Sequence, residues 1–411
     1  MRDPSLVFVG GPLEPFAPGF VAELRGLGYK PVSAVFQLQL VAHASRWLEV
    51  EGLGLEALTP PVVERFIGAR RAAGYTNYVT ARAMGPLLGY LRGLGVAPVA
   101  ASKPAETPVE VLLERYGEYL AVERGLTAPT VEGYAHAVRP FLAGIGGDGD
   151  GDGDGDGELD LGGLSAVQVT AFVVARCPGQ SRGAAKMTVT ALRSLLAFLH
   201  VQGLIGRSLV GAVPSAASWR LSGLPRALGP EQVRGLLDSC DQATRTGRRD
   251  FAILTFLVRL GLRAGEVAGL QLDDIDWRAG ELVVVGKGRR SERLPLPVDV
   301  GEAVTSYLRD GRPGTAQDRS LFVRVKAPHR GLTTGGITQV VVSAAKRSGL
   351  GQIHAHRLRH TAATEMLRAG APLAEIGQVL RHRQALTTAI YAKVDHQALR
   401  QLARPWPGAR S

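Results

Sequence analysis

The sequence predicts a multidomain, mainly α-helical protein: two N-terminal helical modules, followed by an α+β domain with a small β-hairpin. Three observations predict this class. The chain has 411 residues, which is enough for two or three domains. Apolar residues recur at helical spacing through much of it, as at Val35, Leu38, Val41 and Leu48. The clearest paired β runs lie in the stretch 282–297, where two short runs flank a turn.

Residues 1–104 are predicted to form the first helical module. One helix is expected to begin at Pro60, because Thr59 suits the N-cap and proline suits the first helical position. Another helix carries Met84, Leu87 and Leu91 and is expected to end near the glycines of 93–95. The stretch 98–108 has the composition of a linker.

Residues 105–221 are predicted to form a second module on the same plan. Leu164-Ser165 repeats Leu58-Thr59, Phe172 repeats Phe66, and Leu195-Leu196 repeats Leu87-Leu88. We interpret the two modules as a tandem repeat, with two unrelated amphipathic bundles as the alternative. The Asp-Gly loop 146–158 lacks the varied spacing and closing glutamate of a calcium loop, which favours a flexible low-complexity segment.

The third domain is predicted to span 225–411 and to mix helices with short strands. One helix is expected to open at Gly229-Pro230-Glu231, and the apolar run 251–260 is expected to be a buried helix. The runs 282–285 and 294–297 predict a β-hairpin with Lys287 near its tip, and Phe322-Val323 are candidates for a third strand.

The composition limits the classes of partner and compartment. The formal net charge is +11, which favours a polyanion, with nucleic acid ahead of an anionic membrane. The sequence contains no run of about 18 or more apolar residues, so no transmembrane helix is predicted. The N-terminus also lacks a signal-peptide pattern. The two cysteines, Cys177 and Cys240, do not make a disulfide framework, so we expect a cytoplasmic protein.

The stretch from His354 to Tyr391 carries the candidate chemistry. His356 and Arg359 lie three residues apart and share a face if this segment is helical, with Leu358, Ala362 and Met366 on a buried face. Arginine binds phosphate oxygens, histidine moves protons near neutral pH, and tyrosine can be a nucleophile. The alternatives are a solvent-facing basic helix and a metal site, and the latter usually needs cysteine or carboxylate ligands as well.

Four motifs in order resemble the tyrosine recombinase (phage integrase) family, of the integrase and transposon type with an additional N-terminal helical domain. They are GLRAGEVAGL at 261–270, the hairpin GKGRRSERLPLP, HRLRH at 356–360 and LRHRQALTTAIYAKV at 380–394. The resemblance covers 225–400, and it implies that 105–221 is the core-binding domain, with both helical modules SAM-like. In this family a glycine usually stands where this chain has Arg381, and that glycine is expected to need a positive φ.

The resemblance also assigns roles residue by residue. It implies that two arginines clamp the scissile phosphate, that a lysine protonates the leaving 5′-oxygen, and that a tyrosine forms a 3′-phosphotyrosyl bond. It further implies that His356 assists proton transfer at the tyrosine and that His382 contacts the phosphate. Glu266 and His360 are expected to support the site rather than to react. The implied catalytic residues are Arg263, Lys287, His356, Arg359, His382 and Tyr391.

The resemblance implies a site-specific DNA recombinase that needs no metal and no cofactor. The expected partners are a double-stranded DNA recombination site and three further copies of the chain in a tetramer on DNA, with an accessory directionality factor as a further candidate. A type IB topoisomerase, a catalytically silent DNA-binding relative and a membrane-surface protein are the alternatives. The resemblance also implies that the residues from Gln397 onward dock on a neighbouring protomer.

Overall fold

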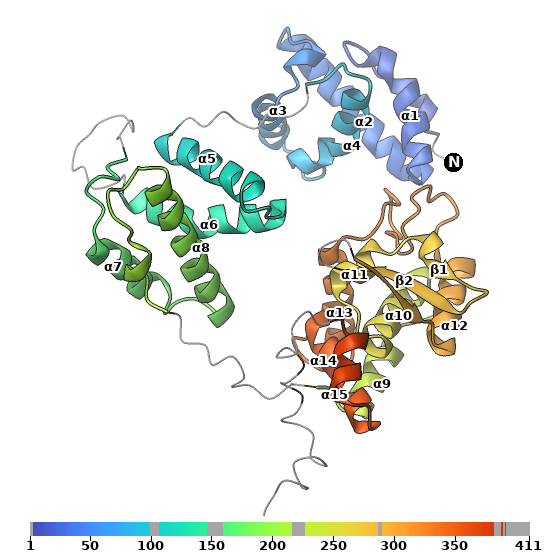
Figure 1. Cartoon of the computed structure of the whole chain (residues 1–411). Helices are drawn as coiled ribbons and strands as arrows, with labels where there is room; N and C mark the ends of the chain where they lie inside the picture. The colour runs from blue at the N-terminus through green and yellow to red at the C-terminus, as the bar shows by residue number, and fades with distance from the viewer. Residues whose placement is uncertain are drawn as a thin grey trace, which may run out of the picture. The chain divides into compact units, whose positions relative to one another are not determined.

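The computed structural model describes residues 3–98, 107–145, 159–215, 227–286, 290–381, 388 and 391 (Figure 1). The chain divides into two compact units: Ala101–Ser222, and a unit that combines Met1–Ala100 with Gly223–Ser411. Separate clusters of buried apolar side chains fill residues 9–97, 112–213 and 228–358. The mainly helical class with one small sheet is confirmed, whereas the division into three domains stays a prediction.

The N-terminal module is helical, as predicted. Thr59 occupies the N-cap position before Pro60, although its side chain makes no capping hydrogen bond. Met84, Leu87 and Leu91 are buried on one face of their helix, which ends at Gly93. The elements are η1 (Pro4–Leu6), η2 (Glu14–Phe16), α1 (Ala17–Gly26), α2 (Pro31–Val50), η3 (Leu55–Ala57), α3 (Pro60–Ala72) and α4 (Ala81–Gly93).

The second module has its own core, built around its last helix. Ser165 caps α7 through a capping box with Gln168, at the position that repeats Thr59. The elements are α5 (Pro108–Val122), α6 (Ala128–Ile145), α7 (Ala166–Arg176), α8 (Arg182–Val201) and η4 (Val210–Ala212). Among the described residues, α8 alone is long and apolar enough to cross a membrane, and half of that window is buried inside the protein. The Asp-Gly loop 146–158 lies outside the described residues.

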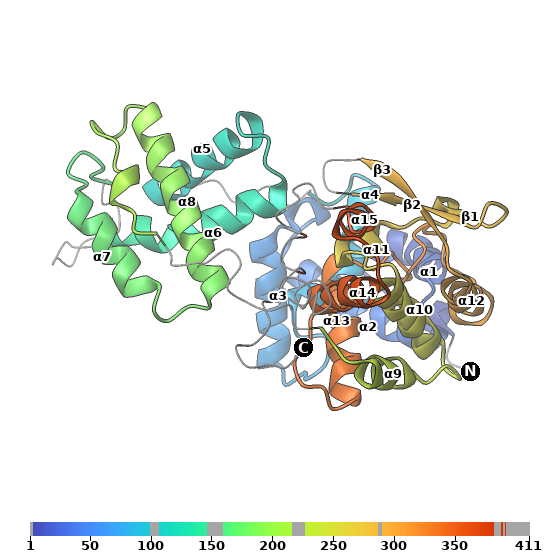
Figure 2. The same ribbon diagram turned by 60° about the horizontal axis from the view of Figure 1, so that its bottom comes forward.

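The third domain places a buried helix, α10 (Arg245–Arg259), against helices from much later in the chain. α10 packs on α12 (Val298–Ser306), α13 (Thr334–Arg347) and α14 (Ala355–Arg368), and Figure 2 shows this grouping. The remaining helical elements are α9 (Pro230–Asp238), α11 (Ala264–Gly269), η5 (Leu272–Asp274), η6 (Tyr307–Gly311) and α15 (Leu373–Val379).

The predicted hairpin is present in an antiparallel sheet of three strands in the order β1-β2-β3. Its strands are β1 (Ile275–Asp276), β2 (Glu281–Val285) and β3 (Ser291–Pro295), with Leu282 opposite Leu294. The prediction of a third strand at Phe322-Val323 is wrong. Both side chains are buried in the core, and Val323 forms only an isolated bridge with Gly331, so a short pair of an aromatic and a β-branched residue was not enough to make a strand.

Candidate active site

The first site arginine is held at the start of α11. Gly261 has a φ of +60°, which turns the chain after α10 and brings Arg263 to the N-cap position of α11. Glu266 accepts hydrogen bonds from the Arg263 backbone N–H at 2.8 Å and from its Nη1 at 2.5 Å. The Arg263 side chain stays 41% exposed while that of Glu266 is only 4% exposed. The buried Glu266 carboxylate therefore fixes the orientation of the guanidinium, while the rest of the Arg263 side chain stays accessible to solvent.

The second site arginine, Arg359, lies on α14 and is almost fully buried. Its Nη1 donates to the Gly261 carbonyl oxygen at 2.6 Å, and its Nη2 donates to the carbonyl of Leu380. Burial, and then repulsion from Arg263, lower the pKa of Arg359 to about 10, so the side chain stays charged at neutral pH. Arg359 thus links the loop before α11 to the end of α15 by hydrogen bonds. Its guanidinium also interacts electrostatically with that of Arg263.

A third arginine completes this network. Arg381 follows α15 with a φ of +54°, the positive angle that the sequence comparison with a glycine led us to expect at this position. Its Nη2 donates to Glu266 at 2.6 Å, and both side chains are 4% exposed. Its carbonyl accepts a hydrogen bond from Arg263 Nη2 at 3.4 Å. The arginine therefore keeps the turn geometry and adds a buried ion pair.

Glu266 binds both Arg263 and Arg381, and this fixes its charge. Burial raises the pKa of its carboxyl, but the hydrogen bond from the Arg263 backbone and the charge of Arg381 outweigh burial, so the pKa is lowered overall. The carboxylate is ionised at neutral pH. One negative charge therefore lies among three arginines, which leaves an excess of positive charge suited to an anion such as a phosphate.

The phenol and the two imidazoles form the other half of the site. Tyr391 is 2% exposed and packs against Ala363, Ile376 and Leu380. Its hydroxyl lies 2.8 Å from Nδ1 of His360, and the His360 ring contacts that of His356 with 4.5 Å between ring centroids. Burial raises the pKa of Tyr391 to about 12, partly offset by the positive charge of Arg359. The phenol therefore needs a base before it can act as a nucleophile at neutral pH.

Both histidines are neutral at physiological pH. Burial lowers the pKa of His360 to about 4, with further lowering by His356 and Arg359. Partial burial, followed by the charges of Arg359 and Arg263, also lowers the pKa of His356. A neutral imidazole can accept a hydrogen bond, and Nδ1 of His360 is the acceptor on the Tyr391 oxygen. The gap between the two pKa values opposes proton transfer in the free protein, and an anionic phosphate bound beside the imidazole would narrow it by raising the pKa of His360.

The structure brings most of the predicted site residues together. Arg263, Glu266 and Arg359 form one connected network, and the charge of Arg359 reaches Tyr391. Lys287 and His382 lie outside the described residues. Within the described residues, no three histidine, cysteine, aspartate or glutamate side chains come together as metal ligands.

Two contacts in the candidate site were not predicted. The resemblance assigned proton transfer to His356, whereas the imidazole on the phenol oxygen is that of His360. The i, i+4 spacing of these histidines places both on one helix face, so the sequence could have signalled either one. The second contact is the ion pair between Arg381 and Glu266. The sequence shows that an arginine replaces the family's usual glycine at 381, but it does not show what this arginine binds.

Comparisons with known proteins agree with these motifs. The model of the "Phage integrase family" matches residues 226–398. "Putative integrase/recombinase y4rA" of Sinorhizobium fredii (strain NBRC 101917 / NGR234) is 41% identical over 97% of this chain and 95% of its own length. "Tyrosine recombinase XerD" of Listeria monocytogenes serotype 4b (strain F2365) is 30% identical over 71% of this chain and 96% of its own.

Two solved structures share the fold. The post-cleavage complex of the XerH site-specific recombinase with a palindromic difH substrate gives a TM-score of 0.58 at 18% identity, covering 74% of this chain and 98% of that one. A lambda integrase (75–356) dimer bound to a COC′ core site gives 0.54 at 17% identity, covering 73% of this chain and 98% of that one.

Proposed function

This chain belongs to the phage integrase family of tyrosine recombinases, and on that premise we propose how its residues act on DNA. The protein is a site-specific DNA recombinase, an enzyme that cleaves and rejoins DNA strands. The residue assignment rests on one observation: the arginine network and the Tyr391–His360 pair are connected through Arg359. The arginine network around Glu266 is linked by Arg359 to the turn that precedes the segment of Tyr391, whose oxygen contacts His360.

The proposed reaction exchanges one ester bond for another. The Tyr391 oxygen attacks the scissile phosphorus while His360, supported by His356, accepts the phenol proton. A 3′-phosphotyrosyl bond forms, the bond to the 5′-oxygen breaks, and Lys287 gives a proton to that oxygen. Attack by a new 5′-hydroxyl on the same phosphorus reverses these steps, so that no external energy source is needed.

Arg263 and Arg359 are proposed to stabilise the charge that develops on the phosphate oxygens. Arg263 is the more accessible of the two, and its orientation is fixed by Glu266 before substrate arrives. Such preorganised donors favour the transition state because they need no rearrangement during the reaction. His382 is proposed to contact the same phosphate. Tyr391 is buried, so the residues around it must move to admit DNA while the contact between its oxygen and His360 is kept.

A nicked suicide substrate tests the assignment. The purified full chain is incubated with its own recombination site carrying a nick next to the scissile position, so that the cleaved end diffuses away. We expect a covalent protein–DNA band that resists SDS and disappears in Tyr391→Phe. A band of equal intensity in Tyr391→Phe, or no band with the native protein on its own site, would refute Tyr391 as the nucleophile.

The partners follow from the same proposal. The substrate is a double-stranded DNA recombination site, and the active assembly is a tetramer in which a directionality factor selects the direction. We place the protein in the cytoplasm at the nucleoid, where its DNA lies. The tail from Gln397 onward, outside the described residues, is proposed to join protomers. The relatives named above are integrases and recombinases and give no support to a topoisomerase, which would relax supercoiled plasmid of any sequence.

A further inference from the structure

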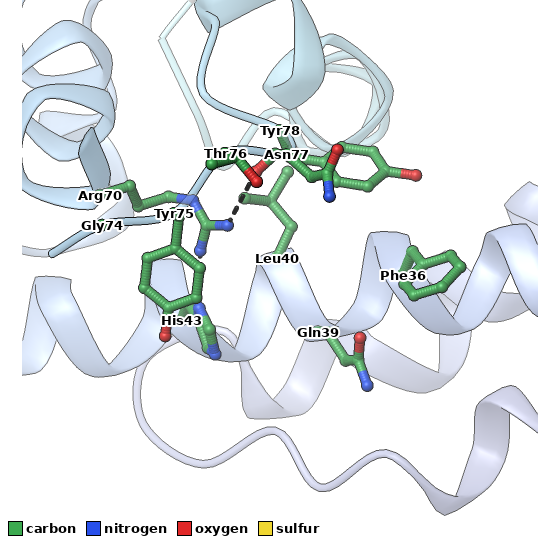
Figure 3. A pocket seen from close by; sticks show the side chains of 10 residues that line it. All are labelled: Phe36, Gln39, Leu40, His43, Arg70, Gly74, Tyr75, Thr76, Asn77 and Tyr78. Carbon is green, nitrogen blue, oxygen red and sulfur yellow. Dashed lines mark hydrogen bonds between the residues drawn. The ribbon is translucent and has the colours of Figure 1, made fainter.

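A cavity of about 720 Å³ lies in the N-terminal module, and its lining includes none of the residues of the arginine–tyrosine site (Figure 3). One wall is a single face of α2, which presents Phe36, Gln39, Leu40 and His43 at spacings of three and four residues. The opposite wall is the loop 74–78 between α3 and α4. None of the roles proposed for DNA cleavage uses these residues.

Arg70, in the last turn of α3, closes one end of the cavity and carries a charge without a counterion. The residue is 8% exposed. Its Nη1 lies 2.6 Å from Nδ1 of His43, and its Nη2 donates to the Asn77 carbonyl at 3.2 Å. Both partners are neutral groups, and the buried Nε has no partner. In the described part of the chain, no carboxylate pairs with this arginine.

A buried cation is unfavourable unless an anion or several hydrogen bonds compensate it. Arg70 is partly compensated by the Tyr75 ring, whose centroid lies 4.2 Å from the guanidinium carbon. His43 adds no charge of its own, because an arginine only donates and Nδ1 must therefore be the unprotonated acceptor. Guanidinium N–H groups thus remain available, and an anionic group would supply the missing charge.

Exposed aromatic side chains lie at both ends of the cavity, Tyr75 beside Arg70 and Phe36 at the opposite end with Tyr78 (Figure 3). Tyr75 is 44% exposed and Phe36 is 39% exposed, although each packs on one side against the module. The loop adopts a strained conformation at Tyr78, whose φ is +55°, and this holds the Tyr78 ring 6.5 Å from that of Phe36. Exposed aromatic rings beside a cation are the arrangement that binds unpaired bases and their phosphates.

We propose that this cavity binds one unpaired nucleotide, with its phosphate on Arg70 beside Tyr75 and its base against the exposed ring of Phe36 at the other end. The side-chain amides of Gln39 and Asn77 line the same cavity and suit the edge of an adenine, which both donates and accepts. A base in a duplex is stacked on both faces, so the occupant is either a free nucleotide or an unpaired nucleotide in a DNA strand.

Binding measurements on the full chain distinguish these sources. The background is Tyr391→Phe, which removes the nucleophile. Deoxyadenosine monophosphate is titrated by calorimetry, and a labelled single-stranded 12-mer and its duplex are titrated by fluorescence anisotropy. Arg70→Gln should weaken binding of the nucleotide and of the single strand by about tenfold, because a charge-assisted hydrogen bond is lost. Arg65→Gln, on the same helix but outside the cavity, is the matched control and should change binding less than about twofold.

Every outcome decides the proposal. Arg70-dependent binding of the free nucleotide supports the proposal and identifies a free nucleotide as the ligand. Arg70-dependent binding of the single strand alone supports it and identifies an unpaired nucleotide in a DNA strand. No Arg70-dependent binding of either probe overturns it. Inorganic phosphate that competes as well as the nucleotide overturns the part played by the base. If Arg70→Gln lowers the melting temperature, Phe36→Ala decides instead, since the exposed Phe36 ring should contribute little to folding and its loss should weaken nucleotide binding severalfold.

Discussion

At the scale of single residues, a residue with a positive φ lies in each of the two proposed sites, the candidate active site and the cavity of the N-terminal module. Among the described residues, Tyr78 and Arg381 are the non-glycine residues with positive φ. Each angle costs about 1 kcal/mol or more, and such strain persists only where the surroundings enforce it. Tyr78 lines the cavity of the N-terminal module, while Arg381 joins Glu266 behind the proposed phosphate clamp. The strain therefore coincides with a proposed binding role in both places.

Replacing Arg381 with glycine tests which effect dominates. Arg381→Gly relieves a strain of about 1 kcal/mol but removes one partner of a buried carboxylate, a loss that reaches about 3 kcal/mol when no other partner remains. Arg263 still binds Glu266, so we expect a net destabilisation of about 1–2 kcal/mol in urea denaturation. Arg381→Gly should lower the free energy of unfolding by less in a Glu266→Gln background, where the carboxylate is already absent. A more stable Arg381→Gly protein would show that strain outweighs the ion pair.

His360 gives a predicted pH dependence. Its pKa is about 4 in the folded protein and 6.5 in the unfolded chain, so the unfolded state binds the proton first as the pH falls. Stability should therefore decline between pH 6.5 and 4 by up to roughly 3 kcal/mol and then level off. His360→Gln should lose this part of the decline in urea denaturation at each pH, whereas the exposed His354→Gln should keep it. Parallel curves for the native protein and His360→Gln would contradict the assignment.

At the scale of elements, the site depends on how closely α10, α14 and α15 approach. A Cβ atom on Gly261 would lie 2.6 Å from Leu380 Cδ2 and 3.2 Å from Ala362 Cβ, at a φ of +60°. The Gly261 carbonyl also accepts from Arg359. One small residue therefore permits the contact between the loop before α11 and the helices that carry the rest of the site.

Gly261→Ala should accordingly disturb both stability and the site. We expect a loss of about 2 kcal/mol or more in chemical denaturation, since strain and steric overlap add. Formation of the covalent DNA complex should fall more than tenfold if Arg359 moves. Gly269→Ala is the matched control, because this glycine ends the neighbouring α11 with open space around it and no positive φ. Equal effects of the two substitutions would mean that the close packing at Gly261 does not matter.

The sequence predicted elements better than contacts. Helical periodicity and the Thr59-Pro60 start located helices well, and the β runs around 282–297 located the hairpin. The third strand was misplaced because two residues, Ile275-Asp276, pair with β2 through tertiary context that no local pattern carries. In the site, residue types were predictable from motifs. Which histidine contacts Tyr391, and what Arg381 binds, depend on side-chain packing between α14 and α15.

At the scale of the whole molecule, the net charge of +11 needs an explanation beyond the site. Many described arginines are exposed even though they pair with a carboxylate, as Arg234, Arg309 and Arg319 do. Exposed pairs of this kind contribute little to stability and are screened by salt. The charge excess is therefore better explained by contacts with the DNA backbone than by folding.

This explanation predicts a steep salt dependence of DNA binding. Contact with about 6–10 phosphates makes the slope of log K against log salt about −5 to −9 and lowers affinity by about 10³-fold or more between 50 and 200 mM salt. Anisotropy titrations of the Tyr391→Phe protein on its own site measure this slope without cleavage. Arg263→Gln should reduce its magnitude by about one, because one phosphate contact is lost. A slope near zero would mean that the positive charge does not bind DNA, and an unchanged slope in Arg263→Gln would remove this arginine from the phosphate clamp.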